Sequence, residues 1–545
     1  MGFTGPRFTW KRGREERYFV AKRLDRILCN AQARLRWQGA IVKHLPYLSS
    51  DHTPLYLQLE PGDTGDPRRR PFRFEAAWLK HSGFKELLLN SWNGALATPN
   101  ALEDLKVKLR KWNKEVFGDI QTRKEKLLTE IKAIQALLES TQTDALLQRE
   151  GELLREFYIV LEQEEVLWYQ KSREKGITLG DRNTKYYHLT TVVRRRRNKI
   201  ESLKDDEGHL VTQPRELEKL ATDYYRKLYS LDDVDAVVER LNPDGFMRLT
   251  WAERNELNKA FSARDVESSI RSMRGFKAPG PDGYQPVFYQ DSWDVVGESV
   301  ARFALEFFRT GVLPPGTNDA IVVLIAKVMK PEKITQFRPI SLCNVLFKTI
   351  TKMMVMRLKR IMPKLIGPAQ SSFIPGRLST DNIVLVQEAM GLFGGYFESV
   401  EAPGELGNMD NACVTGPAMT ILWNGEQTEP FAPRRGLRQG DPLSPYLFVL
   451  CLERLCHLIE EAIDLKKWKP IQLSRGGPKI SHVCFAYDLI LFAEASVTQV
   501  QVIRQVLEKF CVASGQKVSL EKSKIFFSEN VSRELGKLIS DESGI

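Results

Sequence analysis

Arg435-Gly436-Leu437-Arg438-Gln439-Gly440-Asp441-Pro442-Leu443-Ser444-Pro445 decides the fold of this sequence, together with several shorter motifs in the same half of the chain. In chain order these are Lys-Ala-Pro-Gly-Pro-Asp-Gly at 277–283, Leu-Ile-Ala-Lys at 324–327, Phe-Arg-Pro-Ile-Ser-Leu at 337–342, Gln-Ser-Ser-Phe-Ile-Pro-Gly-Arg at 370–377, Phe-Ala-Tyr-Asp at 485–488 and Ser-Gly-Gln-Lys at 514–517. Each motif alone is a weak signal, since Pro-Gly-Pro-Asp-Gly, for example, indicates only a tight turn. Their order within one segment carries the information.

The sequence around these motifs alternates between strand-like and helical patterns. Residues 320–325 form an unbroken apolar run, which predicts a buried strand, and residues 347–361 have the spacing of an amphipathic helix. No regular strand–helix–strand repeat accompanies them. We therefore expect an α+β domain over residues 261–545.

Two further segments precede this domain. Residues 1–62 end in an apolar alternation at 54–59 that predicts a strand, and the Pro- and Gly-rich break at 61–67 predicts a domain boundary. Residues 63–260 contain an amphipathic helical stretch at 101–174, with breaks expected at Gly118 and 140–144. One long rod and an antiparallel helical pair fit this pattern equally well. The pattern itself favours a spacer or packing module.

A basic patch follows the helical stretch. Its cations are Lys185, Arg194, Arg195, Arg196, Arg197 and Lys199, and the aromatic side chains around them are Trp168, Tyr169, Tyr186, Tyr187 and His188. Basic side chains neutralise phosphates and aromatic rings stack on bases, so the patch is a candidate nucleic-acid surface. A solvated charged face or a nuclear-localisation run is an equally good explanation of the pattern alone.

Composition limits the possible classes of protein. The net charge of +11 over 545 residues suits a polyanionic partner, and 42% hydrophobic residues exclude wholesale disorder. The seven cysteines form no Cys-x-x-Cys pair, which predicts free thiols in a reducing compartment. No apolar run approaches the ~20 residues that span a bilayer. We expect a soluble intracellular protein, in the nucleus or the cytoplasm, without a membrane partner.

In this order and spacing, the motifs between residues 270 and 530 resemble the reverse transcriptases of LINE-type (non-LTR) retrotransposons, particularly those of plants. The resemblance implies a right-hand polymerase with fingers and palm, followed here by a truncated thumb. Residues 1–62 resemble the C-terminal strands of the α/β sandwich of the upstream endonuclease, which is of the endonuclease/exonuclease/phosphatase type. Residues 63–260 resemble the helical and basic connector between the two enzymes.

The resemblance implies polymerisation with two Mg²⁺ ions held by carboxylates from two strands. In the family hairpin Phe-Ala-Asp-Asp the first Asp binds metal, but here that position is Tyr487, a neutral phenol with a pKa of about 10. Asp488 alone remains. The other family carboxylate belongs between the Gln370–Arg377 motif and Arg435, where the short segment 391–412 contains Asp410 without a preceding β-branched strand. We interpret this segment as a deletion that leaves the palm incomplete.

At the other functional positions of the family, this sequence matches the family motifs more closely than at the metal site. The residues that the resemblance assigns to the incoming nucleotide and the template are Lys327, Arg338, Arg435, Gly436, Gln439 and Gly440. It assigns Lys522 to the pyrophosphate leaving group. In the endonuclease remnant, Asp51 and His52 match the acid–base end of the site and Asp25 is expected to orient His52. The remnant is not expected to cut, because the family's metal-binding Glu is not found in this sequence.

Three hypotheses follow for function. The first is a reverse transcriptase by descent that has lost polymerisation and whose partners are an RNA template, a DNA primer and deoxynucleotides. The second is a non-catalytic RNA- or DNA-binding protein derived from the same element. The third, an active polymerase, needs metal ligands that the sequence does not identify. The sequence does not predict an oligomeric state.

Overall fold

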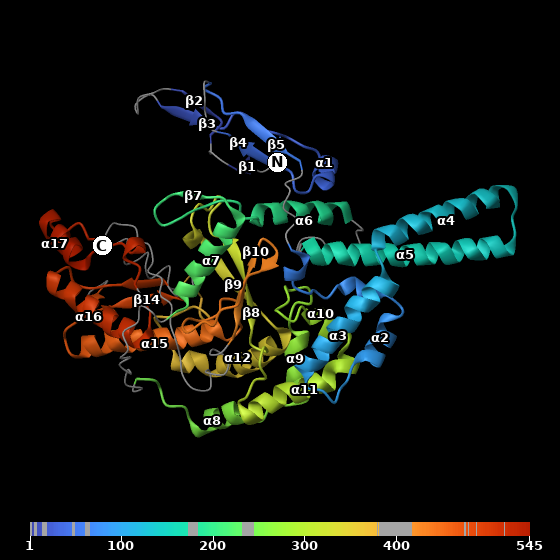
Figure 1. Cartoon of the computed structure of the whole chain (residues 1–545). Coiled ribbons are helices and arrows are strands. Elements are labelled where there is room, and N and C mark those ends of the chain that lie inside the picture. The colour runs from blue at the N-terminus through green and yellow to red at the C-terminus, as the bar shows by residue number, and fades with distance from the viewer. Residues whose placement is uncertain are drawn as a thin grey trace.

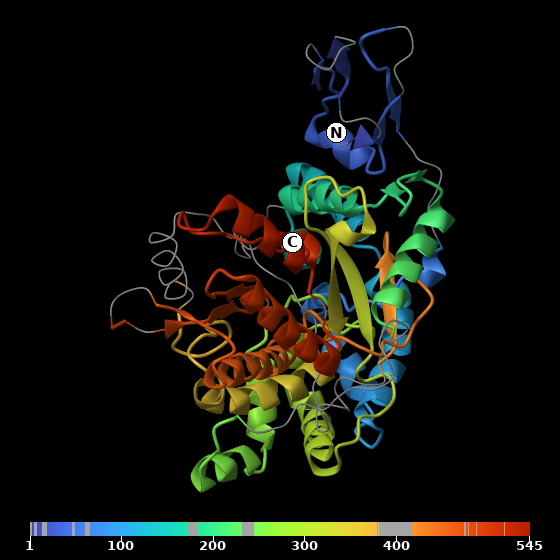
Figure 2. The same cartoon turned by 90° about the vertical axis from the view of Figure 1, so that its left-hand side faces the viewer.

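The computed structural model describes residues 3–4, 8–12, 19–45, 50–59, 66–172, 184–230, 245–378, 380, 417–472, 476–477, 479–486, 488–516 and 518–545. In Figures 1 and 2 a small group of N-terminal strands stands apart from a larger body of helices and strands. In these ranges, no helix combines the length and the apolar character needed to cross a bilayer.

The N-terminal strands form two small sheets. The first has the order β1-β4-β5, made of Phe3–Thr4, Ile41–His44 and Leu55–Gln58, and the second pairs β2 (Trp10–Arg12) with β3 (Val20–Lys22). Strand β5 confirms the strand predicted from the alternation at 54–59. Helix α1 (Ala31–Arg36) begins after Asn30, whose side chain accepts a hydrogen bond from the Ala33 amide.

Residues 63–260, the segment expected to be the connector, are mainly helical where the structure describes them. Its helices are η2 (Pro67–Arg69), η3 (Ala76–Lys80), α2 (Phe84–Ser91), α3 (Thr98–Trp112), η4 (Asn113–Phe117), α4 (Ile120–Ser140), α5 (Asp144–Ser172), α6 (Thr184–Asn198), α7 (Pro214–Leu228) and α8 (Trp251–Asn258). A short hairpin of β6 (Leu203–Lys204) and β7 (Leu210–Val211) lies between α6 and α7.

Helices α4 and α5 form an antiparallel pair that projects from the body (Figure 1). Gly118 breaks the chain before α4 with a φ of 68°, and Asp119 caps the helix by accepting a hydrogen bond from the Thr122 amide at 2.9 Å. The second predicted break, at 140–144, is the turn between the two helices. Of the two arrangements that the sequence allowed, the structure has the pair.

The C-terminal half is centred on a four-stranded sheet of order β11-β10-β8-β9. Strand β8 (Ala320–Ala326) pairs antiparallel with β9 (Phe337–Cys343) and parallel with β10 (Met419–Trp423), while β11 (Glu426–Gln427) forms the edge. The helices of this half are α9 (Ala263–Arg271), α10 (Pro286–Asp291), α11 (Trp293–Thr310), η5 (Ile334–Gln336), α12 (Val345–Leu365), α15 (Ser444–Asp464), α16 (Val497–Ser514), η6 (Leu520–Lys522) and α17 (Arg533–Ser543). Both the strand predicted at 320–325 and the helix predicted at 347–361 are confirmed.

Two small hairpins lie beside α15. Strand β12 (Ile471–Gln472) pairs with β13 (Lys479–Ile480), and β14 (His482–Phe485) pairs with β15 (Asp488–Leu491). Helices α15 and α16 pack on each other, and α17 packs on α16.

The start of the connector shares one hydrophobic core with the C-terminal half. Phe74 is fully buried, and its ring lies 5.1 Å from Phe288 and 6.0 Å from Tyr284. The turn predicted at Pro-Gly-Pro-Asp-Gly is closed by a 3.1 Å hydrogen bond from the Gly283 amide to the Gly280 carbonyl. A Cβ on Gly283 would lie 2.4 Å from the Phe72 carbonyl oxygen, so only glycine allows the two segments to pack this closely.

Candidate active site and nucleic-acid interface

The β14–β15 hairpin presents the remaining carboxylate of the predicted metal site. Phe485 pairs with Asp488, so Asp488 begins β15 directly after the turn, where it is partly buried. Ala486 enters the turn with a φ of 54°, in the left-handed region that non-glycine residues rarely occupy. Tyr487, on which the predicted loss of metal binding depends, lies outside the described residues, as does the 391–412 segment with Asp410.

A buried glutamine holds this hairpin in place. The Gln370 side chain accepts a hydrogen bond from the Ala486 amide at 3.1 Å and donates one to the Ala486 carbonyl at 3.3 Å. Main-chain hydrogen bonds flank this contact, from the Cys484 amide to the Ala369 carbonyl and from the Ser371 amide to the Cys484 carbonyl. The sequence motif at 370–377 contained this residue, but its spacing assigned it no role.

Arg377, at the other end of the same motif, closes the end of α12. Its guanidinium donates to the carbonyl oxygens of Pro363 at 3.1 Å and Ile366 at 2.6 Å, and also to those of Gly367 and Gln370. The last carbonyls of a helix lack partners within the helix, so this side chain satisfies them. The motif thus joins α12 to the β14–β15 hairpin.

The part of the hairpin that the structure describes offers one carboxylate, that of Asp488, to a metal ion. Mg²⁺ prefers several hard, charged oxygen ligands. In the described part of the chain, no three or more His, Cys, Asp or Glu side chains are arranged to hold a metal ion. No polymerisation step is therefore assigned to this site.

Lys327 and Arg338 lie on the same face of the β8–β9 hairpin. Arg338 is opposite Ile325 in the antiparallel register, which places Lys327 diagonally next to it. Both side chains are exposed, and the Lys327 ammonium donates to the Thr335 carbonyl at 3.2 Å. The structure brings together the two cations that the sequence assigned to the triphosphate.

The loop before α15 runs along β9. The Ser341 amide donates to the Gln439 carbonyl at 2.8 Å, and a Cβ on Gly440, where φ is 124°, would lie 2.6 Å from the Ser341 carbonyl oxygen. Gly440 therefore serves packing between the loop and β9, in addition to any approach of a nucleotide. Gly436 has a φ of 84°, and the Arg435 side chain donates to the Leu228 carbonyl at 2.8 Å.

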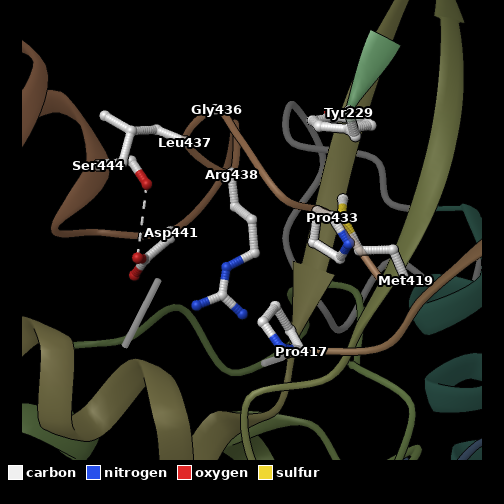
Figure 3. A pocket seen from close by; sticks show the side chains of 9 residues that line it. All are labelled: Tyr229, Pro417, Met419, Pro433, Gly436, Leu437, Arg438, Asp441 and Ser444. Atoms are coloured by element: carbon white, nitrogen blue, oxygen red, sulfur yellow. Dashed lines mark hydrogen bonds between the residues drawn. The ribbon is translucent and has the colours of Figure 1, made fainter. Parts of the chain in front are cut away.

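The same loop lines a pocket with two charged residues that the sequence did not single out. Figure 3 shows Arg438 extending between Asp441 and Pro417. Arg438 is buried, donates to the Asn318 carbonyl and has its guanidinium 4.4 Å from the Phe347 ring centre. Burial raises the pKa of Asp441, and the charge of Arg438 acts in the opposite direction. Both residues belong to the Arg435–Pro445 motif, and membership of this motif was the sequence feature that could have pointed to them.

Lys522 lies in η6 with its side chain exposed, close to Tyr224 of α7. Burial raises the pKa of Tyr224, and the positive charge of Lys522 partly offsets this effect. The predicted pyrophosphate lysine is thus placed next to the connector helix α7.

The residues predicted for the endonuclease remnant form a hydrogen-bonded group. His52 Nδ1 lies 2.8 Å from Asp25 Oδ2, and the Trp10 indole donates to Asp51 Oδ2 at 2.8 Å. The hydrogen bond with His52 is the largest cause of a lowered pKa at Asp25, and a contact with Thr9 adds to it. Asp25 and His52 are therefore in direct contact, and the orienting role of Asp25 stays a prediction.

The arginines of the predicted nucleic-acid patch divide into two pairs on α6. Arg194 donates to the Lys171 and Ser172 carbonyls, and Arg196 forms a two-point ion pair with Glu201. Arg195 and Arg197 are exposed. The side chain of Lys185 lies outside the described residues. Only part of the run is therefore available to a phosphate.

The aromatic side chains near α6 differ in how far they are buried. Tyr187 is fully buried, and the His188 ring stacks on Trp168 at a centroid distance of 3.9 Å. Tyr186 is partly exposed. The expectation that these rings form open stacking platforms is therefore wrong for Tyr187, because the sequence pattern could not separate core aromatics from surface aromatics.

Comparison with known proteins shows which family this part of the chain resembles. Residues 328–537 match the family model described as "Reverse transcriptase (RNA-dependent DNA polymerase)". The matched segment begins directly after Lys327 and includes the Gln370 motif, the loop before α15 and the β14–β15 hairpin.

Similar proteins include several that are named for transposable elements. The "Transposon TX1 uncharacterized 149 kDa protein" of Xenopus laevis is 25% identical over 95% of this chain and 42% of its own length. The "Retrovirus-related Pol polyprotein from type-2 retrotransposable element R2DM" of Drosophila melanogaster is 26% identical over 48% of this chain and 26% of its own length. An uncharacterized mitochondrial protein of Arabidopsis thaliana is 48% identical over 70 residues. The chain thus spans less than half the length of the Xenopus and Drosophila relatives.

Proposed function

We propose that this chain, which carries the reverse transcriptase domain of a LINE-type (non-LTR) retrotransposon, is a degenerate copy that no longer polymerises DNA. The observation that carries the proposal is Tyr487, which stands where the resemblance places a metal-binding Asp. Asp488 begins β15 as the one carboxylate of that hairpin motif.

The expected effect on rate is large. Removing a single charge-stabilising donor from a transition state commonly costs ~3–4 kcal/mol, or about 10²–10³ in rate. We propose that this chain has lost two metal-binding carboxylates, one at position 487, which is now Tyr487, and one in the altered 391–412 segment. Because the two metal ions supply both the attacking oxygen and the stabilisation of the leaving group, their loss is expected to take activity below detection.

The fingers support descent from a working polymerase. Lys327 and Arg338 share one exposed face of the β8–β9 hairpin, where a point charge and a guanidinium fork suit a triphosphate. Asp25 and His52 likewise keep the contact expected at the acid–base end of an endonuclease. We propose that these are inherited binding features whose catalytic partners have been lost.

A second candidate function is RNA or DNA binding without catalysis. The observation that favours it is the net charge of +11, together with exposed arginines on α6 at Arg195 and Arg197. Such binding would depend strongly on salt, because each neutralised phosphate releases condensed counterions. A flat response of the affinity to salt would rule this candidate out.

Primer extension tests the loss of polymerisation. The purified chain is incubated with an RNA template, an annealed DNA primer, deoxynucleotides and MgCl₂, and an active reverse transcriptase serves as the positive control. We expect no extended product from the wild-type chain, and measurable incorporation would overturn the proposal.

The variant Tyr487→Asp separates the two proposed lesions. We expect it to remain inactive, because restoring one carboxylate leaves the second absent. If Tyr487→Asp were active, segment 391–412 would have to supply the other ligand, and Asp410→Asn in that background should then abolish the activity. Asp488→Asn serves as the matched change at the neighbouring hairpin position.

A further inference from the structure

Basic side chains from three separate elements meet where helix α5 ends. Lys171 lies in the last turn of α5, Arg194 and Arg195 lie in α6, and Arg73 lies in the extended segment before η3. In Figure 1 the end of α5 lies below α6. Helices α5 and α6 follow one another in the chain, but Arg73 lies about 100 residues before them, so the fold brings its charge to theirs.

Part of this charge has a structural explanation. Arg194 donates to the carbonyl oxygens of Lys171 and Ser172, which lack partners at the C-terminus of α5. Lys171 lies 3.8 Å from Glu75 and 5.3 Å from the centre of the Trp168 ring. These contacts stabilise the helix end without a ligand.

Arg73 and Arg195 have no such explanation. Both side chains are exposed, and within the part of the chain that the structure describes neither makes an ion pair or a side-chain hydrogen bond. Arg73 also lines a pocket, together with Pro279 and Gly280 of the tight turn. Arg73 therefore lies at a recess between the connector and the polymerase domain, and Arg195 is exposed on α6.

The positive charges at the end of α5 act on one another. The pKa of Arg73 is lowered, first by loss of surrounding water and then by the charges of Arg195 and Arg194. Loss of water also lowers the pKa of Lys171, where Glu75 opposes the effect and Arg195 and Arg73 add to it. Repulsion among these like charges destabilises the free protein, and an anion bound among them would offset it.

We propose that Arg73, Lys171 and Arg195 form a binding site for a phosphate group, occupied by the backbone of a nucleic acid that crosses from the connector to the polymerase domain. A phosphate offers several oxygens, so cations from three elements can contact it together, and arginine can pair with it through two parallel hydrogen bonds. A free phosphate has the same chemistry and is the second possible source. The nucleic-acid assignment rests on the proposed binding function of the chain.

Salt-dependent RNA binding tests the nucleic-acid source. The affinity of the full chain for a fluorescein-labelled single-stranded RNA is measured by anisotropy at several KCl concentrations. We expect Arg73→Ala and Arg195→Ala each to weaken binding about fivefold and to reduce the slope of log Kd against log salt by about 0.7, the value for one lost contact to a single strand. Arg73→Lys should keep most of the slope because it keeps the charge.

Arg155→Ala is the matched control. Arg155 is an exposed arginine on the same helix as Lys171, and sixteen residues separate the two, or about 24 Å along α5. Arg155→Ala removes one positive charge from an exposed position outside the cluster, so an equal effect from Arg155→Ala and Arg73→Ala would mean a general charge effect and would overturn the proposal. Thermal unfolding of each variant separates lost binding from lost folding.

Inorganic phosphate and pyrophosphate test the other source. If the wild type and Arg73→Ala bind RNA equally well, but pyrophosphate raises the melting temperature of the wild type alone, the site holds a free phosphate. If the wild type binds no RNA at all, the proposed nucleic-acid binding is wrong, and the pyrophosphate experiment still shows whether the phosphate site exists. If neither RNA nor pyrophosphate distinguishes wild type from Arg73→Ala and Arg195→Ala, the site does not exist.

Discussion

The carboxamide of Gln370 contacts both backbone polar groups of Ala486, and this contact fixes a backbone conformation that alanine does not favour. It accepts from the Ala486 amide and donates to the Ala486 carbonyl, while Ala486 has a φ of 54°. A non-glycine residue in this region persists only where its surroundings hold it. Gln370 is therefore what keeps Asp488 at its place directly after the turn.

Gln370→Ala should loosen the β14–β15 hairpin, while the rest of the domain stays as well protected against hydrogen exchange as in the wild type. Each lost hydrogen bond contributes about 0.5–1.5 kcal/mol, so we expect exchange of the backbone amides in residues 483–491 to speed up roughly 10- to 100-fold. Hydrogen exchange followed by mass spectrometry measures this effect, and the peptides of β8 and β9 give the reference within the same molecule.

Gln499 provides a matched control for this variant. It is also buried, and it bonds to two backbone groups, since its side chain accepts from the Lys469 amide at 2.8 Å and donates to the Lys467 carbonyl at 2.8 Å. Gln499→Ala removes the same groups from a different loop. If both variants accelerated exchange in the hairpin equally, Gln370 would have no specific role there.

At the scale of elements, α15 carries a buried carboxylate that joins it to the end of α12. Glu453 accepts a hydrogen bond from the Gly367 amide at 2.7 Å and lies 3.7 Å from His457. Burial raises the pKa of Glu453 to about 7, and Glu460 adds to the rise, while the Gly367 amide, Arg377 and Arg454 oppose it. The side chain is therefore largely neutral in mildly acidic solution and must ionise inside the protein at alkaline pH.

The stability of the folded chain should therefore depend on Glu453 as pH rises. An acid whose pKa is raised on folding contributes nothing unfavourable below its unfolded value of about 4.5, and it destabilises the fold increasingly from there to about pH 7, above which the loss is constant. Glu453→Gln keeps the oxygen that accepts from Gly367. We expect it to match wild type at pH 4 and to exceed it at pH 8 by up to about 3 kcal/mol in the free energy of unfolding.

Urea unfolding at several pH values measures this difference. His457, whose pKa is lowered by burial and by Arg454, is present in both proteins, so its own titration largely cancels. Glu461→Gln, at an exposed position on the same helix, is the control and should give a difference that does not change with pH. A pH-independent gap between wild type and Glu453→Gln would contradict the prediction.

Local pattern predicted the elements well where periodicity was strong. The strand at 320–325, the helix at 347–361 and the breaks at Gly118 and 140–144 all appear in the structure. Periodicity could not choose between a rod and a helical pair, because both bury the same apolar stripe. It also could not tell that Tyr187 is buried while Arg195 is exposed, because that division depends on the contact between α5 and α6.

At the scale of the whole molecule, the ordered motifs indicated the polymerase domain, and family comparison agrees with that identification. What the sequence did not reveal are the contacts between motifs. Gly440 lies against β9, Gln370 holds the hairpin and Arg438 contacts Phe347, and each of these depends on segments that are distant in the chain. The shared core of Phe74 and Phe288 likewise joins the connector to the polymerase domain, although composition alone placed them in separate segments.

Magnesium should leave the stability of this molecule unchanged. A ligand that binds only the folded state at about 100 times its Kd adds about 2.7 kcal/mol to the free energy of unfolding, so an intact polymerase site would raise the melting temperature in millimolar Mg²⁺. With Asp488 as the hairpin's one carboxylate, we expect equal melting temperatures in MgCl₂ and in EDTA at matched ionic strength. CaCl₂ controls for general effects of divalent cations. A rise specific to Mg²⁺ that disappears in Asp488→Asn would show that the chain holds the metal, and with it that other carboxylates complete the site.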